Sequence, residues 1–394
     1  MLKRSTAKYS LDHIAKRIAL FVLFAVMLAP AFPRNKSEAT PESLDAVLEP
    51  IRLKYDLPAL AGAIVTSQGL VAHGAVGVRK YRVAAPVTID DQFHLGSDTK
   101  AMTATMLATL VEQGKLKWDV TLSDALPELA PQMDPAYRSV TLQQLLSHRA
   151  GFTAESWPIA MSIDDIRNLP GTPREQRWAY AQIILGEPPA IPPATKFLYS
   201  NRSYAIAGVV AERAMNSPWE DLMRERIFEP LGMTTCGFGA MGTPGEVDQP
   251  WQHTLFLTMH RPIGPGPRAD NPPAIGPAAT VHCSIGDWAK FVQAHLRGEK
   301  GLAGILAPEA FRKLHTSPYG ANEYAFGWIP EDRAWGGGRV LMHAGSNTQN
   351  FAVVWLSPLR DFAVLAATNQ GGDDAFHGVD DAAYAMILRF NSRR

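Results

Sequence analysis

The sequence carries no excess of charge of either sign. Its 394 residues include 38 lysines and arginines and 38 aspartates and glutamates, so the formal net charge is zero. A basic surplus would attract nucleic acid and an acidic surplus would mark a solvated tail, and neither is present. Internal repeats and low-complexity tracts are also missing. With 46% hydrophobic residues, the chain has the composition of a globular protein with a large core, and we expect no nucleic-acid partner.

Cysteine is scarce as well. The chain has two cysteines, Cys236 and Cys283, too few for a metal site made of cysteines. They are compatible with a disulfide or with two buried free thiols, and the sequence does not choose between these states. The 11 histidines are scattered singly, and no H-x-H or H-x-x-x-H pair places two of them on one element. We therefore expect neither a metal nor another cofactor.

The apolar run near the N-terminus is too short for a membrane span. IALFVLFAVMLA, residues 18–29, has twelve residues, whereas a spanning helix needs roughly 20. Lysines and arginines precede it, and Ala29 at its end and Ala31 after it supply the small residues of a cleavage site, which is the pattern of a secretory signal peptide. We expect a signal peptide over residues 1–31, cleaved after Ala31, then a polar spacer over 32–41. The protein would then be exported, periplasmic or secreted, with an uncleaved N-terminal anchor as the alternative and no other membrane contact.

The pattern of apolar residues predicts strands at both ends of the remaining chain and helices between them. Residues 60–80 read as two strands joined by a turn at 67–69, and strands starting at Arg339, Phe351 and Phe362 read as an antiparallel meander. Helices are expected over residues 42–53, 99–114, 140–151, 204–215, 284–297 and 380–390. This order favours one mixed sheet that carries a large helical insertion.

Three of these segments allow a more specific prediction. The helix over 99–114 has its large apolar residues on one stripe and is expected to be amphipathic. Ser284, with an aspartate three residues on, is expected to cap the helix over 284–297. The proline-rich stretches 187–194 and 262–277 suit neither a helix interior nor a central strand. We expect them to be ordered surface loops that rim the functional site.

Ser97 and Lys100 lie one helical turn apart at the start of the helix expected over 99–114. A serine hydroxyl is a poor nucleophile near neutral pH and needs a base within hydrogen-bond reach. The i+3 spacing puts the amine on the same helical face as the hydroxyl, and the positive end of the helix favours an anion at Ser97. The alternative is a solvated helix lysine without chemistry, as in a second pair of this spacing, Ser5 and Lys8.

Two further motifs follow in chain order. YSN at residues 199–201 precedes a helix, and HAG at residues 343–345 leaves a strand. The phenol of Tyr199 would lose its proton more easily beside an ammonium and could act as a second base. Asn201 would hold Lys100 or a substrate amide by hydrogen bonds. The structural alternatives are a core tyrosine, a turn asparagine and a histidine bonded within the sheet. A G-x-S-x-G elbow is missing, which argues against an α/β-hydrolase.

The three motifs in this order resemble those of the serine β-lactamase and penicillin-binding-protein superfamily, S-x-x-K, [S/Y]-x-N and [K/H]-[T/S/A]-G. The tyrosine and histidine versions are similar to class C β-lactamases, D-alanyl-D-alanine carboxypeptidases, D-aminopeptidases and related esterases. LLSHRAGF, FEPLGM and PAATVHCSIGDWAKF also look familiar for this branch. The resemblance covers residues 42–390 and implies one catalytic domain of the α/β (α+β), β-lactamase/transpeptidase-like class. Its mixed, mainly antiparallel sheet would lie in an α/β lobe over about 42–95 and 278–390, and the helical lobe over about 96–277.

The resemblance also implies a mechanism without a cofactor. Ser97 would attack a carbonyl and form an acyl-enzyme, which water then releases, while Lys100 and Tyr199 handle the proton. The backbone N–H groups of Ser97 and Ser346 would form the oxyanion hole. Gly345 would let a substrate backbone lie close to the strand.

His343 departs from the lysine that many β-lactamases carry at this place. A histidine is only partly charged near neutral pH, so it offers less to the carboxylate of a penicillin. We therefore expect an exported esterase or peptidase that acts on small esters or D-amino-acid peptides of cell-wall type. A β-lactamase or D-alanyl-D-alanine carboxypeptidase proper is the alternative. A receptor that is slowly acylated by a penicillin or cell-wall fragment would carry the same motifs, and a solute-binding protein would leave them without a role.

Overall fold

The computed structural model describes residues 40–153, 161–257 and 259–393. The expected signal peptide, residues 1–31, lies outside the described residues together with nearly all of the spacer, so its cleavage and the export of the protein stay predictions. Within the described part of the chain, no helix is both long and apolar enough to cross a membrane. Residues 41–394 form one compact unit, and the division into two lobes stays a prediction.

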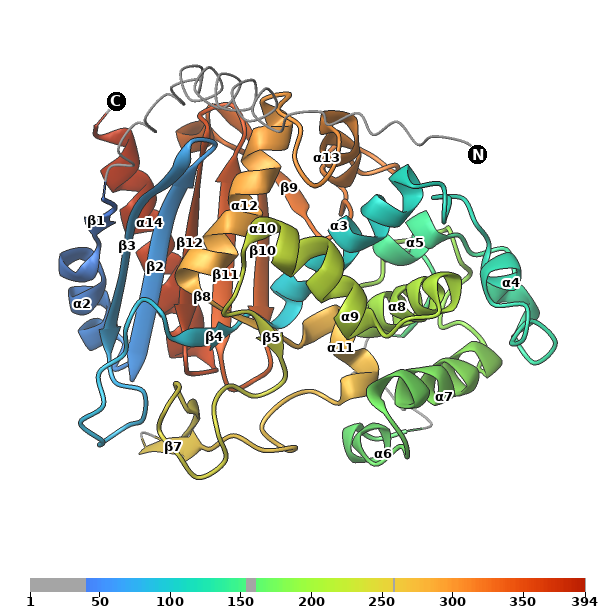
Figure 1. Ribbon diagram of the computed structural model, residues 1–394, viewed down its shortest axis with the longest axis horizontal. Helices are drawn as coiled ribbons and strands as arrows, with labels where there is room; N and C mark the ends of the chain where they lie inside the picture. Colours follow the sequence, from blue (N-terminus) through green and yellow to red (C-terminus); the bar gives the residue numbers. More distant parts are fainter. Residues whose placement is uncertain (1–39, 154–160, 258, 394) are drawn as a thin grey trace, which may run out of the picture. The chain divides into compact units, whose positions relative to one another are not determined.

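Both ends of the chain supply the strands of the main sheet, as predicted (Figure 1). Within the described residues the strand order is β1-β3-β2-β12-β11-β10-β9. β1 pairs with β3 in parallel, and the other neighbours are antiparallel. The mixed, mainly antiparallel sheet, the first hairpin and the C-terminal meander are therefore confirmed. The strands are β1 (Glu42–Ser43), β2 (Ala59–Thr66), β3 (Gly69–Gly77), β9 (Ile329–Arg333), β10 (Gly338–Ser346), β11 (Phe351–Ser357) and β12 (Phe362–Thr368).

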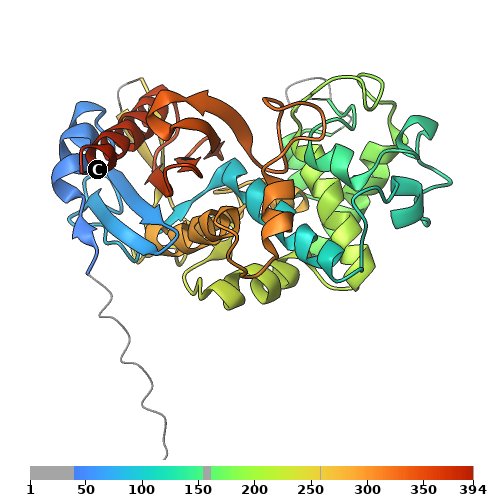
Figure 2. The same cartoon turned by 90° about the horizontal axis from the view of Figure 1, so that it is seen from above.

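Helices cover both faces of this sheet (Figure 2). Val364 of β12 packs in one apolar cluster with Leu48 and Met386, whereas its neighbour Leu365 packs in the other cluster with Phe291. Successive side chains of a strand point to opposite faces, so β12 is buried along its whole length. The covering helices are α2 (Asp45–Lys54) and α14 (Asp373–Asn391) on one face and α12 (Ile285–Glu299) on the other. α14 begins earlier than the predicted residue 380, with Asp373 and Asp374 in its first turn, where acidic groups are favourable.

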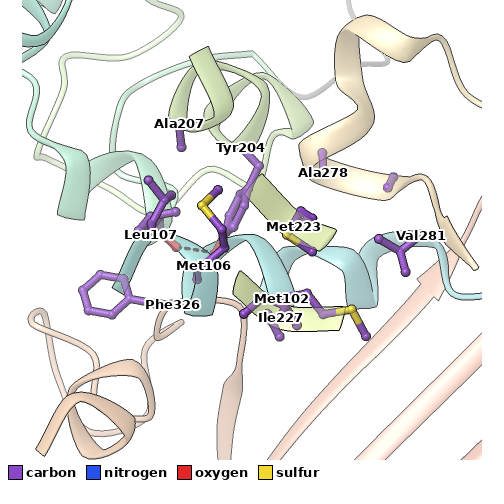
Figure 3. Close-up of a cluster of buried hydrophobic side chains, with 14 of the residues drawn as sticks. Met102, Met106, Leu107, Tyr204, Ala207, Met223, Ile227, Ala278, Val281 and Phe326 are labelled. Atoms are coloured by element: carbon purple, nitrogen blue, oxygen red, sulfur yellow. Dashed lines mark hydrogen bonds between the residues drawn. The ribbon is translucent and has the colours of Figure 1, made fainter. Parts of the chain in front are cut away.

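α3 (Thr99–Glu112) is the central helix of the part that carries the site. The prediction that it is amphipathic is wrong. Its residues are buried on every side from Thr99 to Leu110. Figure 3 shows Met102 and Met106 of this helix among apolar side chains of several other segments, including Tyr204. The threonine side chains of the helix bond to backbone groups: Thr103, for example, donates to the carbonyl of Pro277 at 2.7 Å. A helix satisfied in this way can be buried all round.

The remaining helices and strands include two corrections. The helix expected over 140–151 is only α5, because a capping box opens it at Thr141 and His148 turns the chain away with a φ of 55°. The stretch 262–277 is not a surface loop throughout: it contains the end of β7 and, at its far end, a buried turn that leads into α11. The bounds are α4 (Leu122–Ala125), α5 (Leu142–Leu146), α6 (Ile163–Arg167), α7 (Pro173–Gly186), α8 (Asn201–Met215), α9 (Trp219–Met223), α10 (Glu229–Leu231), α11 (Gly276–Ala279), α13 (Pro308–Leu314), β4 (Gln92–His94), β5 (Gly237–Phe238), β6 (Gln252–Phe256), β7 (Met259–Ile263) and β8 (Val281–Ser284).

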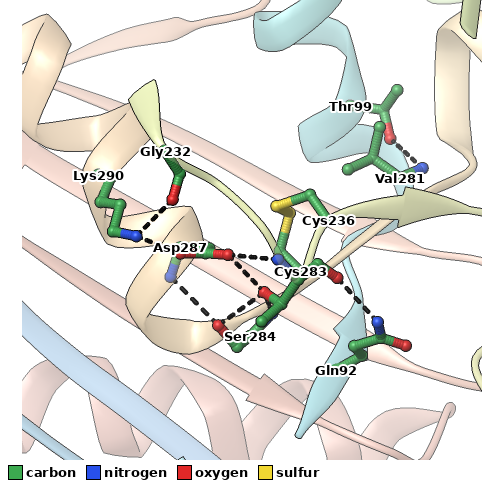
Figure 4. The surroundings of a disulfide bond; sticks show 10 residues. Gln92, Thr99, Gly232, Cys236, Val281, Cys283, Ser284, Asp287 and Lys290 are labelled. Atoms are coloured by element: carbon green, nitrogen blue, oxygen red, sulfur yellow. Dashed lines mark hydrogen bonds and ion pairs between the residues drawn. A yellow bond between two sulfur atoms is a disulfide. The ribbon is translucent and has the colours of Figure 1, made fainter. Parts of the chain in front are cut away.

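A disulfide joins Cys236 to Cys283, which decides between the two states that the sequence left open (Figure 4). It ties the segment before β5 to β8, and polar contacts surround it. Asp287 accepts hydrogen bonds from the backbone N–H and the hydroxyl of Thr235, both at 2.7 Å. Ser284 caps α12, as predicted, by accepting the backbone N–H of Asp287.

Candidate active site

Ser97 lies in a short 3₁₀ turn, Gly96–Asp98, that runs directly into α3. The Nζ atom of Lys100, on the first turn of α3, lies 2.9 Å from the Oγ atom of Ser97. At this distance a proton can pass directly between the two groups. Ser97 is half-buried, whereas Lys100 is fully buried. The structure thus brings together the nucleophile and the base that the i, i+3 spacing predicted.

Two more oxygens hold the Lys100 amine in place. Oδ1 of Asn201 accepts a hydrogen bond from Nζ at 2.6 Å, and the carbonyl of Ala278 accepts one at 3.1 Å. Together with Ser97 Oγ, these contacts match the three N–H bonds of an ammonium. The amine is therefore aimed at the serine by partners from α8 and α11, and Asn201 has the position predicted for it.

Tyr199 faces the same amine. Lys100 Nζ lies 4.7 Å from the centroid of its ring. The ring also packs on the imidazole of His148, with centroids 4.4 Å apart. His148 holds the loop before α8: its Nδ1 accepts the backbone N–H of Ser200 at 3.2 Å, and its carbonyl accepts that of Leu198 at 2.9 Å. Burial first, and the nearby positive charge of Lys100 second, lower the pKa of His148 well below its usual value, so Nδ1 stays free to accept.

β10 runs beside the turn that carries Ser97, and two glycines make this approach possible. A β-carbon on Gly345 would lie 2.0 Å from the carbonyl oxygen of Leu95 and 2.6 Å from the backbone nitrogen of Ser97. A β-carbon on Gly96 would lie 2.3 Å from the backbone nitrogen of Ser346. The two amides predicted to form the oxyanion hole therefore belong to one tight junction. Gly345 is needed for the contact between strand and turn, which adds a second reason to the one given from the sequence.

His343 is buried beneath this junction. Its Nε2 is hydrogen bonded to the hydroxyl of Tyr324 at 3.0 Å, and its Nδ1 to the carbonyl of Ala344 at 2.9 Å. Burial, with the positive charge of Lys100 as the second cause, lowers the pKa of His343 to about 3. Asp98 lies 3.6 Å from Nδ1, and burial raises the pKa of this carboxyl well above its usual value. His343 is thus neutral near pH 7, and the third motif supplies no positive charge.

Sequence reasoning missed three contributors to this site. His148 lies in LLSHRAGF, a stretch noted only as familiar, and nothing in the sequence marked its contact with Tyr199. Tyr324 has no motif, and the carbonyl of Ala278 carries no side-chain signal at all. In the part of the chain that the structure describes, no group of three or more histidine, cysteine or acidic side chains could hold a metal ion.

The described geometry defines a class of protein. A half-buried serine beside a buried lysine, a tyrosine across from that lysine and two amides at one junction are the parts of a serine hydrolase that works through an acyl-enzyme. The chain belongs to the β-lactamase family, whose model matches residues 44–388. Its serine hydrolase relatives include an esterase and a further hydrolase.

Individual relatives agree with this assignment. Penicillin-binding protein 4 of Amycolatopsis lactamdurans is 27% identical over 341 residues, which cover 83% of this chain and 84% of that protein. Lovastatin esterase of Penicillium rubens is 31% identical over 166 residues, covering 39% of this chain and 41% of the esterase. Among solved structures, the octameric penicillin-binding protein homologue from Pyrococcus abyssi superposes with a TM-score of 0.72 at 22% identity, covering 88% of this chain and 77% of that one. The last comparison shows the shared fold.

Buried neutral histidines predict that acid destabilises the protein. The pKa is lowered to about 3 for His343 and to about 4 for His253 and His282, in each case mainly by burial. Below pH 6.5 these histidines bind a proton in the unfolded chain but stay unprotonated in the folded protein. The free energy of unfolding therefore falls as the pH drops towards 4. Each histidine contributes up to about 1.4 kcal/mol per pH unit. Asp98, with its raised pKa, works in the opposite direction and offsets part of this loss.

Urea unfolding at pH 7, 6 and 5 measures this dependence. The midpoint should fall steadily with pH, and His282→Gln should flatten the curve. A midpoint that stays constant or rises between pH 7 and 5 would contradict the prediction.

Proposed function

We infer that this chain is an exported serine hydrolase that cleaves small, uncharged esters through an acyl-enzyme at Ser97. The observation that carries this choice is the burial of a neutral His343 beside the oxyanion junction, where the Tyr324 hydroxyl and the Ala344 carbonyl already occupy both of its ring nitrogens. A substrate carboxylate placed there would lose water without gaining a cation in return, which is costly. An acyl group without charge pays no such penalty. The similarity to an esterase supports the same choice.

The reaction follows from the contacts around Ser97. Lys100 first loses one proton to solvent and becomes a neutral amine, which still donates to Asn201 and Ala278. The hydroxyl of Ser97 then passes its proton to this amine, with Tyr199 as the second base, while Oγ bonds to the ester carbon. The backbone amides of Ser97 and Ser346 hold the negative oxygen that forms. The leaving alcohol takes the proton back, and a water molecule, activated by the same bases, releases the acid.

A second candidate is a receptor that is acylated by a penicillin or cell-wall peptide and turns over slowly. It is favoured by the similarity to penicillin-binding protein 4 along most of both chains. Peptides built from D-amino acids would be the natural ligands in that case. The two functions share every residue of the site and differ in the rate at which water releases the acyl group.

Three substrates separate these functions. We expect p-nitrophenyl acetate to be hydrolysed with at least a tenfold higher kcat/KM than mono-p-nitrophenyl succinate, which adds a free carboxylate, and nitrocefin to be the slowest of the three. Faster turnover of nitrocefin would show a β-lactamase instead. Stoichiometric acylation by a fluorescent penicillin without turnover of any ester would show the receptor. Ser97→Ala, expected to be inactive throughout, is the control.

Export has its own test. Residues 1–40 fused to alkaline phosphatase without its leader should give phosphatase activity outside the bacterial cytoplasm, where that enzyme becomes active. An inactive fusion would contradict export, whatever the substrate proves to be.

A further inference from the structure

A buried polar cluster lies directly behind the oxyanion junction. It consists of His94, Asp270 and Asn347, which are 0%, 6% and 5% exposed. Nε2 of His94 lies 2.8 Å from Oδ1 of Asp270. The N–H bond does not point straight at this oxygen, so the contact is a close polar one rather than a linear hydrogen bond. Nδ2 of Asn347 donates to the same oxygen at 3.2 Å.

The other ring nitrogen of His94 reaches the turn that carries the nucleophile. Nδ1 accepts the backbone N–H of Gly96 at 3.1 Å. The next carbonyl, that of Gly96, accepts the backbone N–H of Thr99. The contact with Thr99 orients the peptide between Gly96 and Ser97, while His94 holds the preceding peptide, so the conformation of Gly96 is fixed from both sides. Since a trans peptide points its N–H away from its C=O, these contacts set the direction of the Ser97 N–H.

Asp270 also reaches the other parts of the site. Asn347 directly follows Ser346, whose amide is the second donor of the oxyanion hole. On the other side, Asn271 donates its side-chain N–H to the carbonyl of Ala279 at 2.9 Å. Ala279 is the neighbour of Ala278, which accepts from Lys100. One loop residue and its neighbour therefore contact three segments that must keep their relative positions during catalysis.

We propose that Asp270 and His94 are positioning residues that aim the Ser97 N–H into the oxyanion hole. In a neutral imidazole one nitrogen donates and the other accepts. Nδ1 accepts from Gly96 only when the proton is on Nε2, and the carboxylate of Asp270 beside Nε2 favours that tautomer. Without Asp270, the proton can move to Nδ1, where it would face the Gly96 N–H, and the turn loses its anchor.

The proposal rests on the serine hydrolase chemistry of Ser97 and is tested with a probe that needs no particular substrate. A phenylboronic acid binds Ser97 Oγ reversibly and forms a tetrahedral adduct with an oxygen in the oxyanion hole. Its Kd therefore measures how well the N–H groups of Ser97 and Ser346 are oriented towards that oxygen. His94→Asn keeps a hydrogen-bond acceptor near the position of Nδ1, where it can accept the Gly96 N–H. His94→Gln keeps a polar group near the position of Nε2, beside Asp270, and loses the acceptor for Gly96. We expect His94→Gln and Asp270→Leu to weaken boronate binding at least tenfold. His94→Asn and Asp270→Asn should stay within about threefold of the wild type.

Ester kinetics and a matched histidine complete the test. In His94→Gln, kcat should fall in parallel with boronate affinity while KM changes less than about twofold, because the donor acts mainly in the transition state. His282→Gln is the control: His282 pairs with His94 across β4 and β8, but its ring bonds to the carbonyl of Gly239, away from Ser97. It should cost stability and leave boronate binding unchanged.

Each outcome decides the proposal. Variants of His94 that melt earlier but bind boronate as the wild type does would show a structural role and overturn it. A lower kcat with unchanged boronate affinity would also overturn it. If Asp270→Leu does not fold, the comparison of the Asn and Gln variants at His94 still decides. A wild type that binds boronate but hydrolyses no ester refutes the proposed substrate and leaves this test intact, whereas one that binds no boronate refutes both.

Discussion

Lys100→Met is expected to lower kcat/KM by at least about a thousandfold, and Ser97→Ala by at least as much. Removing either member of a nucleophile–base pair costs nearly the whole effect of the pair, because the members act as a unit. The double variant should therefore be no less active than the worse of the two single variants. Lys100 also stabilises the negative charge that develops on Ser97 Oγ during the attack, since its Nζ lies 2.9 Å from that oxygen.

The same substitution should not reduce stability greatly and can raise it. Lys100 is fully buried, and burying an amine costs free energy that a methionine of similar shape does not. Lost activity with an unchanged or higher Tm would mark Lys100 as a residue kept for chemistry at the expense of stability.

Lys290→Met provides the matched control. The amine of Lys290 on α12 is also held by hydrogen bonds, to the carboxylate of Asp287 and the backbone carbonyl of Gly232, at 2.6 Å each. It lies, however, in the surroundings of the disulfide (Figure 4). Its replacement should leave kcat/KM within about twofold. A Lys100→Met enzyme with more than a tenth of wild-type activity would contradict the assigned role.

The order of strands and helices was predictable because it depends on local patterns. Alternation and turn residues give the hairpin over 60–80 and the C-terminal meander, and the cap at Ser284 is a matter of three residues. The burial of α3 was not predictable in this way. Its large apolar residues form one stripe, while small residues and threonines fill the rest. Only the packed structure shows that Thr103 reaches the carbonyl of Pro277 and Thr105 that of Ala101, so that the polar face needs no water.

The site divides along the same line. The pairing of Ser97 with Lys100 follows from helical spacing, but Asn201, 101 residues beyond Lys100, could be joined to it only through the family resemblance. The neutrality of His343 depends on its burial beside Lys100, and burial is a property of the folded chain. The contact between Asp270 and His94 is still harder to predict from the sequence, because neither residue belongs to one of the three motifs and no regular spacing relates them.

Gly345→Ala is the second large effect we expect, and it tests the junction that this fold builds around Ser97. Gly345 has an ordinary strand conformation, so alanine would suffer no backbone strain there. The added carbon, however, would meet the carbonyl oxygen of Leu95 at 2.0 Å and the Ser97 nitrogen at 2.6 Å. Both are backbone atoms, so β10 or the nucleophile turn must move. We expect a loss of about 3 kcal/mol of stability or more, and at least a hundredfold loss in kcat for the folded fraction, as when an oxyanion donor is misplaced.

Gly286→Ala shows how a harmless version of the same change behaves. A β-carbon at Gly286, in the first turn of α12, would meet nothing within 4 Å, and alanine favours the helix by up to about 1 kcal/mol. This variant should keep full activity and gain stability. A Gly345→Ala enzyme with wild-type kcat would mean that strand and turn can separate by the width of a methyl group without loss. The two amides would then not need the tight contact seen between β10 and the Ser97 turn, and the oxyanion hole assigned to them would have to be sought elsewhere.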